Sequence, residues 1–290
     1  MWLAVGLVWG TSWGVIGLGL RDLPPLTFAA SRTMIAAAAL VLYALARHGG
    51  RLPRTRRAVS FWLAMGVPQI GAPYALIFWA QQHIDSGLTA MLFATFPVFT
   101  TVLAHFVLHD EPLTVRRVSG VMLAVVAVAV LIGQPSGFVA PPLLPVLAVL
   151  LASFSGAVGT VLVRRHGRET STVWLTALQV TAAGGFLAIL ALVFERGASV
   201  RVTPDSVLAV VYLALVVTVG CYIGLFWLLK HLEAAVVSMG VVLETTVAVF
   251  VGAVILGEML TWLNVLGLTL VALSIWFVTK RPPARELIRP

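Results

Sequence analysis

Charged side chains are scarce in this chain of 290 residues, because Asp, Glu, Lys and Arg together supply only 10% of it. A soluble globular domain carries about 25% charged residues. Apolar residues make up 60% of the sequence, and the mean hydropathy is +1.02. This composition excludes a soluble enzyme or a soluble binding domain and indicates a protein embedded in a lipid bilayer.

Cysteine and the common catalytic motifs are also missing. The single cysteine, Cys221, excludes an intramolecular disulfide. Histidines at positions 83, 105, 109 and 231 fall near span ends, where hydrogen bonding at the membrane surface is the default interpretation, so we expect neither a metal nor a cofactor. No Walker-type phosphate loop occurs, which argues against ATP-driven transport. The motif "SFSG" at 153–156 lacks the G-x-S-G pattern of an intramembrane serine protease, and no Gly-x-Gly-Asp is present, so an enzyme is disfavoured.

Long apolar stretches make up nearly all of the chain. A helix that crosses a bilayer needs about 20 apolar residues. Ten such stretches lie at roughly 2–20, 26–46, 60–82, 86–107, 115–133, 142–163, 172–194, 206–229, 234–256 and 261–279. The short connectors leave no room for a soluble catalytic or nucleic-acid-binding domain, and the tail at 282–290 is predicted to be disordered.

The net charge of +8 does not indicate a nucleic-acid partner, because the basic residues are sorted by connector. If the N-terminus is cytoplasmic, the outward connectors hold only Arg21, Arg196 and Arg201. Inward connectors hold the other Lys and Arg apart from Arg32, which lies within a span. Positive residues concentrate on the cytoplasmic side of membranes, so we predict that both termini are cytoplasmic and that the lipid bilayer is the expected partner.

The two halves of the chain match each other. "FWAQQHIDSG" at 78–87 aligns with "FWLLKHLEAA" at 226–235, and "EPLTVRRVSG" at 111–120 aligns with "EMLTWLNVLG" at 258–267. Each half holds five predicted spans, an odd number, so the second copy enters the membrane from the opposite side. We therefore predict an all-α membrane protein of ten helices, with inverted five-helix repeats at residues 1–135 and 136–281 around a central cavity, as in many secondary transporters.

Several short motifs carry a family resemblance over essentially the whole chain. They are "WGTSW" at 9–13, Arg32 early in the second span, Glu111 after the fourth span and "LGE" at 256–258 after the ninth. Together they resemble the EamA family of the drug/metabolite transporter superfamily. Two positions depart from the family pattern: Asp110 precedes Glu111 where glycine is usual, and Thr245 follows Glu244 where proline is frequent.

The resemblance implies a secondary transporter of the cytoplasmic (inner) membrane that works by alternating access. Within the family the similarity is to bacterial amino-acid exporters, which implies export of amino acids, including aromatic or other apolar ones. Export of other metabolites or of cationic drugs stays open as the alternative. A membrane-embedded enzyme and a channel are disfavoured, the channel because a single deep carboxylate does not supply a ring of polar groups. The oligomeric state is left open, and a monomer is compatible with this architecture.

Small residues predict close helix contacts. Gly6, Gly10 and Gly14 form a smooth strip on one face of the first helix. Nearby hydroxyls in the first and sixth spans have two open interpretations, because they can bond to their own helix or bind a ligand in the cavity. They are Thr11, Ser12, Ser153 and Ser155.

Prolines predict breaks that can act as hinges. Pro97 lies inside the fourth span, where its missing N–H leaves the Phe93 carbonyl unbonded and its ring kinks the helix. Pro68 and Pro73 bracket "QIGA" in the third span and predict a similar break. Static kinks remain the alternative to hinges.

Aromatic residues divide into two predicted groups. Trp79 and Trp227 lie near span ends, where Trp and Tyr anchor helices at the membrane surface. Trp9 and Trp13 lie deeper, beside polar residues, and are predicted cavity walls for an apolar or aromatic side chain. Two tyrosines, Tyr74 and Tyr222, are candidate cavity residues as well.

Two charged residues lie within spans and are the strongest candidates for function. Glu244 falls near the middle of the ninth span, so it should face the cavity and hold a proton, meet a cation or accept hydrogen bonds. Two roles are open for Glu244. A protonated Glu244 could join two helices by hydrogen bonds only, or the carboxylate could bind a substrate amine or couple transport to protons. For Arg32 the open interpretations are a side chain that reaches outward to the membrane surface, an interhelical charge pair, and binding of a substrate carboxylate.

Overall fold

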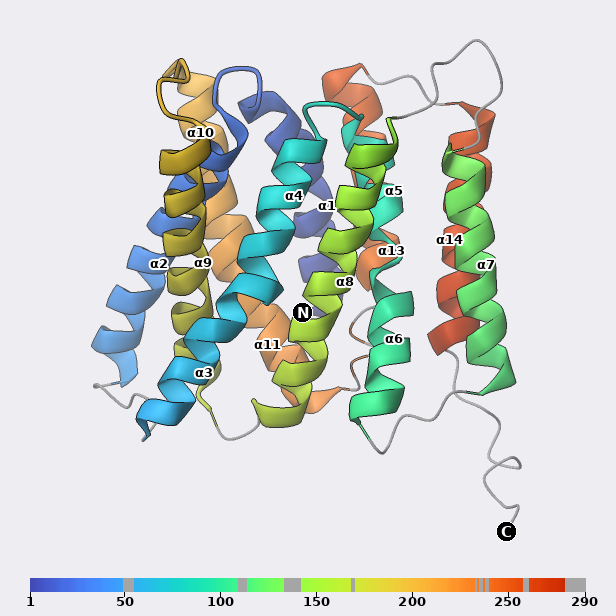
Figure 1. Cartoon of the computed structure of the whole chain (residues 1–290), viewed down its shortest axis with the longest axis horizontal. Coiled ribbons are helices and arrows are strands. Elements are labelled where there is room, and N and C mark those ends of the chain that lie inside the picture. The colour runs from blue at the N-terminus through green and yellow to red at the C-terminus, as the bar shows by residue number, and fades with distance from the viewer. Residues whose placement is uncertain are drawn as a thin grey trace.

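The computed structural model describes residues 1–48, 55–108, 114–132, 142–167, 170–232, 234, 237, 240–257 and 261–279. The predictions for Arg51, Asp110, Glu111, Glu258, Lys280 and the tail at 282–290 lie outside these residues. Every regular element in the described ranges is a helix, with no strand. Figure 1 shows the helices running roughly alongside one another, so that the loops gather at the two ends of the molecule.

The first half of the chain contains helices α1 to α7. In order they are α1 (Trp2–Gly19), α2 (Pro25–His48), α3 (Arg56–Gly66), the π-helical turn η1 (Val67–Gly71), α4 (Ala72–Ala80), α5 (Ser86–Phe93), α6 (Phe96–Val107) and α7 (Val115–Ile132). The elements α3, η1 and α4 form one continuous but irregular rod, and α5 and α6 are separated by a two-residue break.

The second half contains the remaining helices. They are α8 (Leu143–His166), α9 (Thr172–Phe194), α10 (Pro204–Tyr212), η2 (Leu213–Cys221), α11 (Tyr222–His231), α13 (Gly240–Val251), η3 (Gly252–Leu256) and α14 (Trp262–Thr279). Another π-helical segment, η2, again interrupts a rod, between α10 and α11. Gly257 ends η3 with a left-handed backbone (φ +72°), a conformation that glycine adopts without steric cost.

Seven helical segments of the described chain are long and apolar enough to cross a membrane. They are Trp2–Gly19, Pro25–Ala46, Arg56–Ala80, Ser86–Val107, Leu143–His166, Thr172–Phe194 and Pro204–His231. Leu243–Leu256 and Trp262–Ser274 are shorter apolar helices. Length and apolar character together confirm the prediction of an all-helical membrane protein.

The glycine strip of α1 makes the close helix contact that the sequence predicted, and its partner is α13. A Cβ atom built at Gly10 would lie 2.5 Å from the Val247 Cβ and 2.8 Å from the Glu244 carbonyl oxygen. At Gly14 the same atom would lie 2.5 Å from the Val251 Cγ1. Because glycine leaves this space free, the backbones of the two helices approach closely and place Glu244 beside α1.

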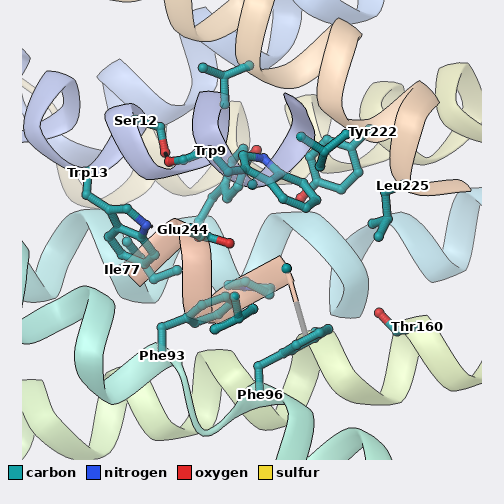
Figure 2. A pocket seen from close by; sticks show the side chains of 18 of the residues that line it. Trp9, Ser12, Trp13, Ile77, Phe93, Phe96, Thr160, Tyr222, Leu225 and Glu244 are labelled. Carbon is teal, nitrogen blue, oxygen red and sulfur yellow. Dashed lines mark hydrogen bonds between the residues drawn. The ribbon is translucent and has the colours of Figure 1, made fainter. Parts of the chain in front are cut away.

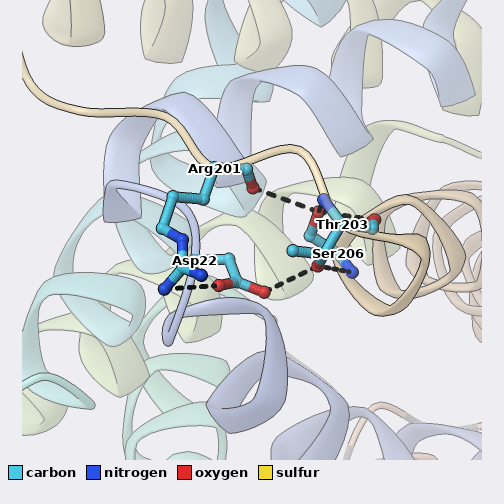
Figure 3. A network of polar contacts seen from close by, with 4 residues as sticks. All are labelled: Asp22, Arg201, Thr203 and Ser206. Atoms are coloured by element: carbon cyan, nitrogen blue, oxygen red, sulfur yellow. Dashed lines mark hydrogen bonds and ion pairs between the residues drawn. The ribbon is translucent and has the colours of Figure 1, made fainter.

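Two loops that are distant in sequence meet at one end of the molecule, at the top of Figure 1 beside α10. Asp22 accepts a hydrogen bond from the Thr203 hydroxyl (2.7 Å) and pairs loosely with Arg201 (3.9 Å), as Figure 3 shows. Thr203 and Ser206 also form a capping box that starts α10. The exposed ion pair contributes little by itself, so the connection depends on the hydrogen bonds.

A carboxylate at the same end joins α9 to α2. The first backbone N–H groups of α2 lack intrahelical partners, and Glu195 accepts hydrogen bonds from Leu26 N and Thr27 N, each at 2.7 Å. A negative charge at a helix N-terminus also interacts favourably with the helix dipole. Glu195 therefore caps α2 in place of a local residue.

Candidate substrate cavity

An internal cavity of about 110 Å³ lies among helices from both halves of the chain. Its lining residues come from α1, α2, η1, α4, α5, α6 and α8, and from η2, α11 and α13. Figure 2 shows Trp9 and Tyr222 on one side of this space and Phe93 and Phe96 on the other. Segments far apart in the sequence thus enclose a single volume.

Aromatic rings form a large part of the cavity wall. Trp9 meets Tyr222 edge to face at 5.6 Å between ring centroids, and Tyr222 meets Tyr74 at 6.4 Å. On the opposite wall Phe93 stacks on Phe96 at 5.7 Å. Ring pairs at these distances are favourable contacts beyond the area that they bury. The wall is therefore largely apolar and suited to an aromatic or aliphatic group.

The four aromatic residues that the sequence assigned to the cavity all line it: Trp9, Trp13, Tyr74 and Tyr222. Trp79 and Trp227 do not. Each lies near a helix end and packs on the histidine four residues later, His83 and His231 respectively. Their positions agree with a role as anchors at the membrane surface.

Glu244 on α13 points into the cavity and is 6% exposed. Its Oε1 accepts a hydrogen bond from the Trp13 indole N–H at 2.9 Å. Among the described residues no basic side chain forms an ion pair with it. An ionised carboxylate in apolar surroundings costs several kcal/mol, so this side chain is held where a proton or a cationic ligand can neutralise it.

Arg32 on α2 also lines the cavity, and its side chain is only 1% exposed. The Nη2 atom donates to the Thr218 hydroxyl (2.9 Å), the Tyr74 hydroxyl (3.2 Å) and the Leu213 carbonyl (3.3 Å). The guanidinium lies over the Tyr74 ring, 4.5 Å from its centroid. The interpretation that Arg32 reaches outward to the membrane surface is therefore wrong, because η2 and Tyr74 supply acceptors in the interior.

Of the two predicted hydroxyl residues on α1, one faces the cavity and the other faces a neighbouring helix. Ser12 lines the cavity, and its hydroxyl donates to the Trp9 carbonyl. Thr11, one residue earlier, is not among the lining residues; its hydroxyl donates to the Val8 carbonyl (2.7 Å) and lies 2.6 Å from the Tyr212 hydroxyl.

Ser153 and Ser155 bond to interrupted helices and are not among the lining residues. The Ser153 hydroxyl donates to the Phe93 carbonyl (3.3 Å), the group that the missing N–H of Pro97 leaves unbonded. Ser155 donates to the Pro68 carbonyl at 2.8 Å. The two hydroxyls of α8 thus supply the hydrogen bonds that the breaks remove, as is common for broken helices in membranes.

The proline-containing breaks occur where the sequence predicted them. The helix stops at Phe93 and restarts at Phe96, with Pro97 in the first turn of α6. Pro68 lies inside η1, and Pro73 lies in the first turn of α4 and lines the cavity. Whether these breaks move as hinges stays a prediction.

Several lining residues were not predicted as site residues. They are Trp2, Gln69, Ile77, Phe78, Phe93, Phe96 and Thr160, among others. A phenylalanine within an apolar span gives no signal of its own, because it suits lipid, core and cavity equally. Gln69 carried a signal, since a buried amide requires partners, and its Nε2 donates to Thr160 Oγ1 (3.1 Å).

A helical membrane protein with an enclosed aromatic cavity and two buried charges has the architecture of a membrane transport protein. The chain belongs to the EamA-like transporter family, which it matches over residues 1–133 and 143–280. The family assignment confirms the resemblance noted from the motifs, and it places the protein among transporters and not among enzymes.

Relatives of the chain agree with this class. The chain is 26% identical to the uncharacterized transporter YoaV of Bacillus subtilis, over 96% of this chain and 94% of that protein. It is 25% identical to the uncharacterized inner membrane transporter YedA of Escherichia coli, over 99% and 93%. It is also 25% identical to a probable amino-acid metabolite efflux pump of Escherichia coli, over 94% and 92%. A solved crystal structure superposes with a TM-score of 0.71 over 98% of both chains at 18% identity, which shows the shared fold.

Proposed function

We propose that the protein is a secondary transporter that exports amino acids, including aromatic and other apolar ones, across the cytoplasmic membrane. The observation that carries this proposal is Glu244, a single buried carboxylate in an aromatic-walled cavity. The carboxylate suits a substrate ammonium group, and the rings around it suit an apolar side chain and a cation. The efflux pump among the relatives supports export and supports amino acids as substrates.

Alternating access is the mechanism that we propose, with ten spans in two inverted repeats. Each half contains one rod with a π-helical interruption beside the cavity, η1 in the first and η2 in the second. Irregular helices next to a cavity are typical of transporters whose halves move against each other around a substrate site. Pro68, Pro73 and Pro97 are the proposed hinge positions. One chain supplies the whole cavity, which supports a functional monomer.

Solute counterflow tests this function. Purified protein in liposomes loaded with unlabelled phenylalanine should accumulate external labelled phenylalanine transiently above equilibrium, because an alternating-access carrier exchanges substrate across the membrane. Liposomes without protein are the control. Equilibration without overshoot would indicate a channel, and counterflow of a cationic dye but of no amino acid would replace the proposed substrate class by the alternative one.

The proposed orientation places both termini and the connector around Arg51 in the cytoplasm. In a background in which Cys221 is replaced by alanine, Arg51→Cys and Lys280→Cys should resist a membrane-impermeant thiol reagent added to intact cells. Arg196→Cys, in a connector assigned to the outside, should react. Labelling of both Arg51→Cys and Lys280→Cys in intact cells would reverse the orientation. Labelling of only one of them would contradict the even number of spans proposed between them, and with it the inverted five-helix repeats.

A further inference from the structure

The cavity contains two fixed charges of opposite sign that do not pair with each other. Arg32 and Glu244 both line it, yet they form no ion pair; the ion pair found in the described part of the chain is that of Arg201 with Asp22. Two buried charges that do not neutralise each other are costly unless a third group completes them. The arrangement therefore points to a ligand that carries both signs.

Arg32 is anchored on one side only. All three of its hydrogen bonds come from Nη2, and within the described residues neither Nε nor Nη1 has a hydrogen-bond partner. The acceptors that hold Nη2 are two hydroxyls and a carbonyl, all neutral. Both edges of a guanidinium that can hold a carboxylate with two N–H donors include Nη2, which is occupied here, so a carboxylate would bind through the N–H groups of Nη1 alone as a charge-assisted hydrogen bond. These three acceptors hold the guanidinium in place but do not neutralise its positive charge, so the guanidinium can still bind an anion.

Glu244 shows the complementary arrangement. Trp13 donates to its Oε1 and thereby orients the carboxylate, and this is the hydrogen bond that the described residues make to Glu244. A series of contacts runs between the two charges along the wall: Arg32 touches Tyr74, whose ring meets Tyr222, whose ring meets Trp9. Trp13 lies one helical turn after Trp9 on α1. Both charges therefore belong to one continuous site.

We propose that Arg32 binds the carboxylate of the substrate while Glu244 binds its ammonium group, so that the transported compounds are zwitterionic amino acids. This inference depends on the proposed function and narrows it, because an amine without a carboxylate leaves Arg32 unsatisfied. Cationic drugs and decarboxylated amines are then poor substrates. Specificity of this kind arises because a buried group left unpaired is costly.

A comparison of two substrates on the unmodified protein gives the first test. Phenylalanine and 2-phenylethylamine share the ring and the amine and differ in the carboxylate. In counterflow assays we expect the half-saturating concentration of the amine to be about tenfold higher or more. Equal half-saturating concentrations of phenylalanine and 2-phenylethylamine would overturn the proposed role of Arg32. They would not contradict the proposed export through a cavity in which Glu244 binds the amine. Failure of both compounds to exchange would instead overturn the proposed function, and the present inference with it.

Variants of Arg32 give the second test. Arg32→Gln should raise the half-saturating concentration of phenylalanine by about tenfold or more and change that of 2-phenylethylamine by a much smaller factor, because the amine has no carboxylate for the guanidinium to bind. Arg32→Lys should recover part of the loss, because it keeps the positive charge but cannot donate both to the Thr218 hydroxyl and to a carboxylate from the same positions as the guanidinium. The matched control is Arg164→Gln, which removes a guanidinium that donates to the Leu229 carbonyl outside the cavity and should change neither value by more than about twofold.

The outcome that contradicts the inference is specific. If well-folded Arg32→Gln protein, judged by size-exclusion profile, binds both compounds more weakly by the same factor, Arg32 is only a structural anchor of α2 on η2. If the variant does not fold, the comparison of phenylalanine with 2-phenylethylamine on the unmodified protein still decides the question.

Discussion

Glu244→Gln is expected to abolish amino-acid exchange in proteoliposomes or to remove its pH dependence. Glutamine keeps the volume of the side chain and an oxygen that can accept the Trp13 hydrogen bond, but it has neither charge nor a proton to release. Removing one member of a buried charge pair costs about 2–5 kcal/mol, which corresponds to a loss of roughly 30-fold to several thousand-fold in substrate affinity. The measurement is counterflow of labelled phenylalanine across a range of pH.

The matched control for this variant is Glu195→Gln. Glu195 is a carboxylate outside the central cavity that caps α2, and glutamine retains one of the two oxygens that accept from the backbone N–H groups of Leu26 and Thr27. We expect its exchange rate and pH profile to stay close to those of the unmodified protein. If Glu244→Gln also exchanges phenylalanine at an unchanged rate and pH profile, Glu244 is only a hydrogen-bonded tie between α1 and α13, and our assignment of the site fails.

Gly10→Val is expected to have the largest effect on the folded protein. The Cβ atom alone would lie 2.5 Å from the Val247 Cβ and 2.8 Å from the Glu244 carbonyl oxygen, and backbone atoms cannot move aside as a side chain can. Overpacking of this kind costs about 1–3 kcal/mol or more. We expect α1 and α13 to separate, with loss of the Trp13–Glu244 hydrogen bond. Thermal denaturation in detergent, followed by size-exclusion chromatography, should show a much lower midpoint or no monodisperse protein.

Two alanine variants complete this test. Gly10→Ala is a smaller substitution at the same position, and Gly185→Ala is the matched control. Alanine at position 10 adds only the clashing Cβ, so it should destabilise less than valine does. Gly185 lies within α9 with no atom of a neighbour within 4 Å of an added Cβ. Alanine there should be neutral or slightly stabilising, since it favours the helix by about 1 kcal/mol over glycine. Equal stability of the Gly10 and Gly185 variants would disprove the close packing of α1 on α13.

The sequence by itself determined the solvent, the class of fold and the places where proline breaks a helix, but not the interruptions η2 and η3, which contain no proline. Apolar composition requires a membrane, and a membrane requires helices or a barrel whose backbone bonds are satisfied internally. The interruption before Pro97 followed from a missing N–H, and the contact of Gly10 with a neighbouring helix followed from small residues at four-residue spacing. These features depend on local covalent structure, so no knowledge of neighbours was needed.

The sequence also predicted correctly that Glu244 lies in the interior, because the free-energy cost of exposing a carboxylate to lipid is too high. It could not identify the partner helix. The tertiary structure decided that Trp13 of α1 holds the carboxylate, and that the unsatisfied Phe93 carbonyl is bonded by Ser153 of α8.

Only the tertiary structure decided which polar side chains face the cavity. Arg32 turns inward because η2 presents the Thr218 hydroxyl and the Leu213 carbonyl to it, acceptors that its own helix does not supply. Ser12 and Ser153 have the same hydroxyl and lie in similarly apolar helices, yet only Ser12 lines the cavity. The side to which such a group points depends on the rotation of each helix about its axis, and packing between helices fixes that rotation. In an almost uniformly apolar span the sequence contains little periodic signal from which to derive it.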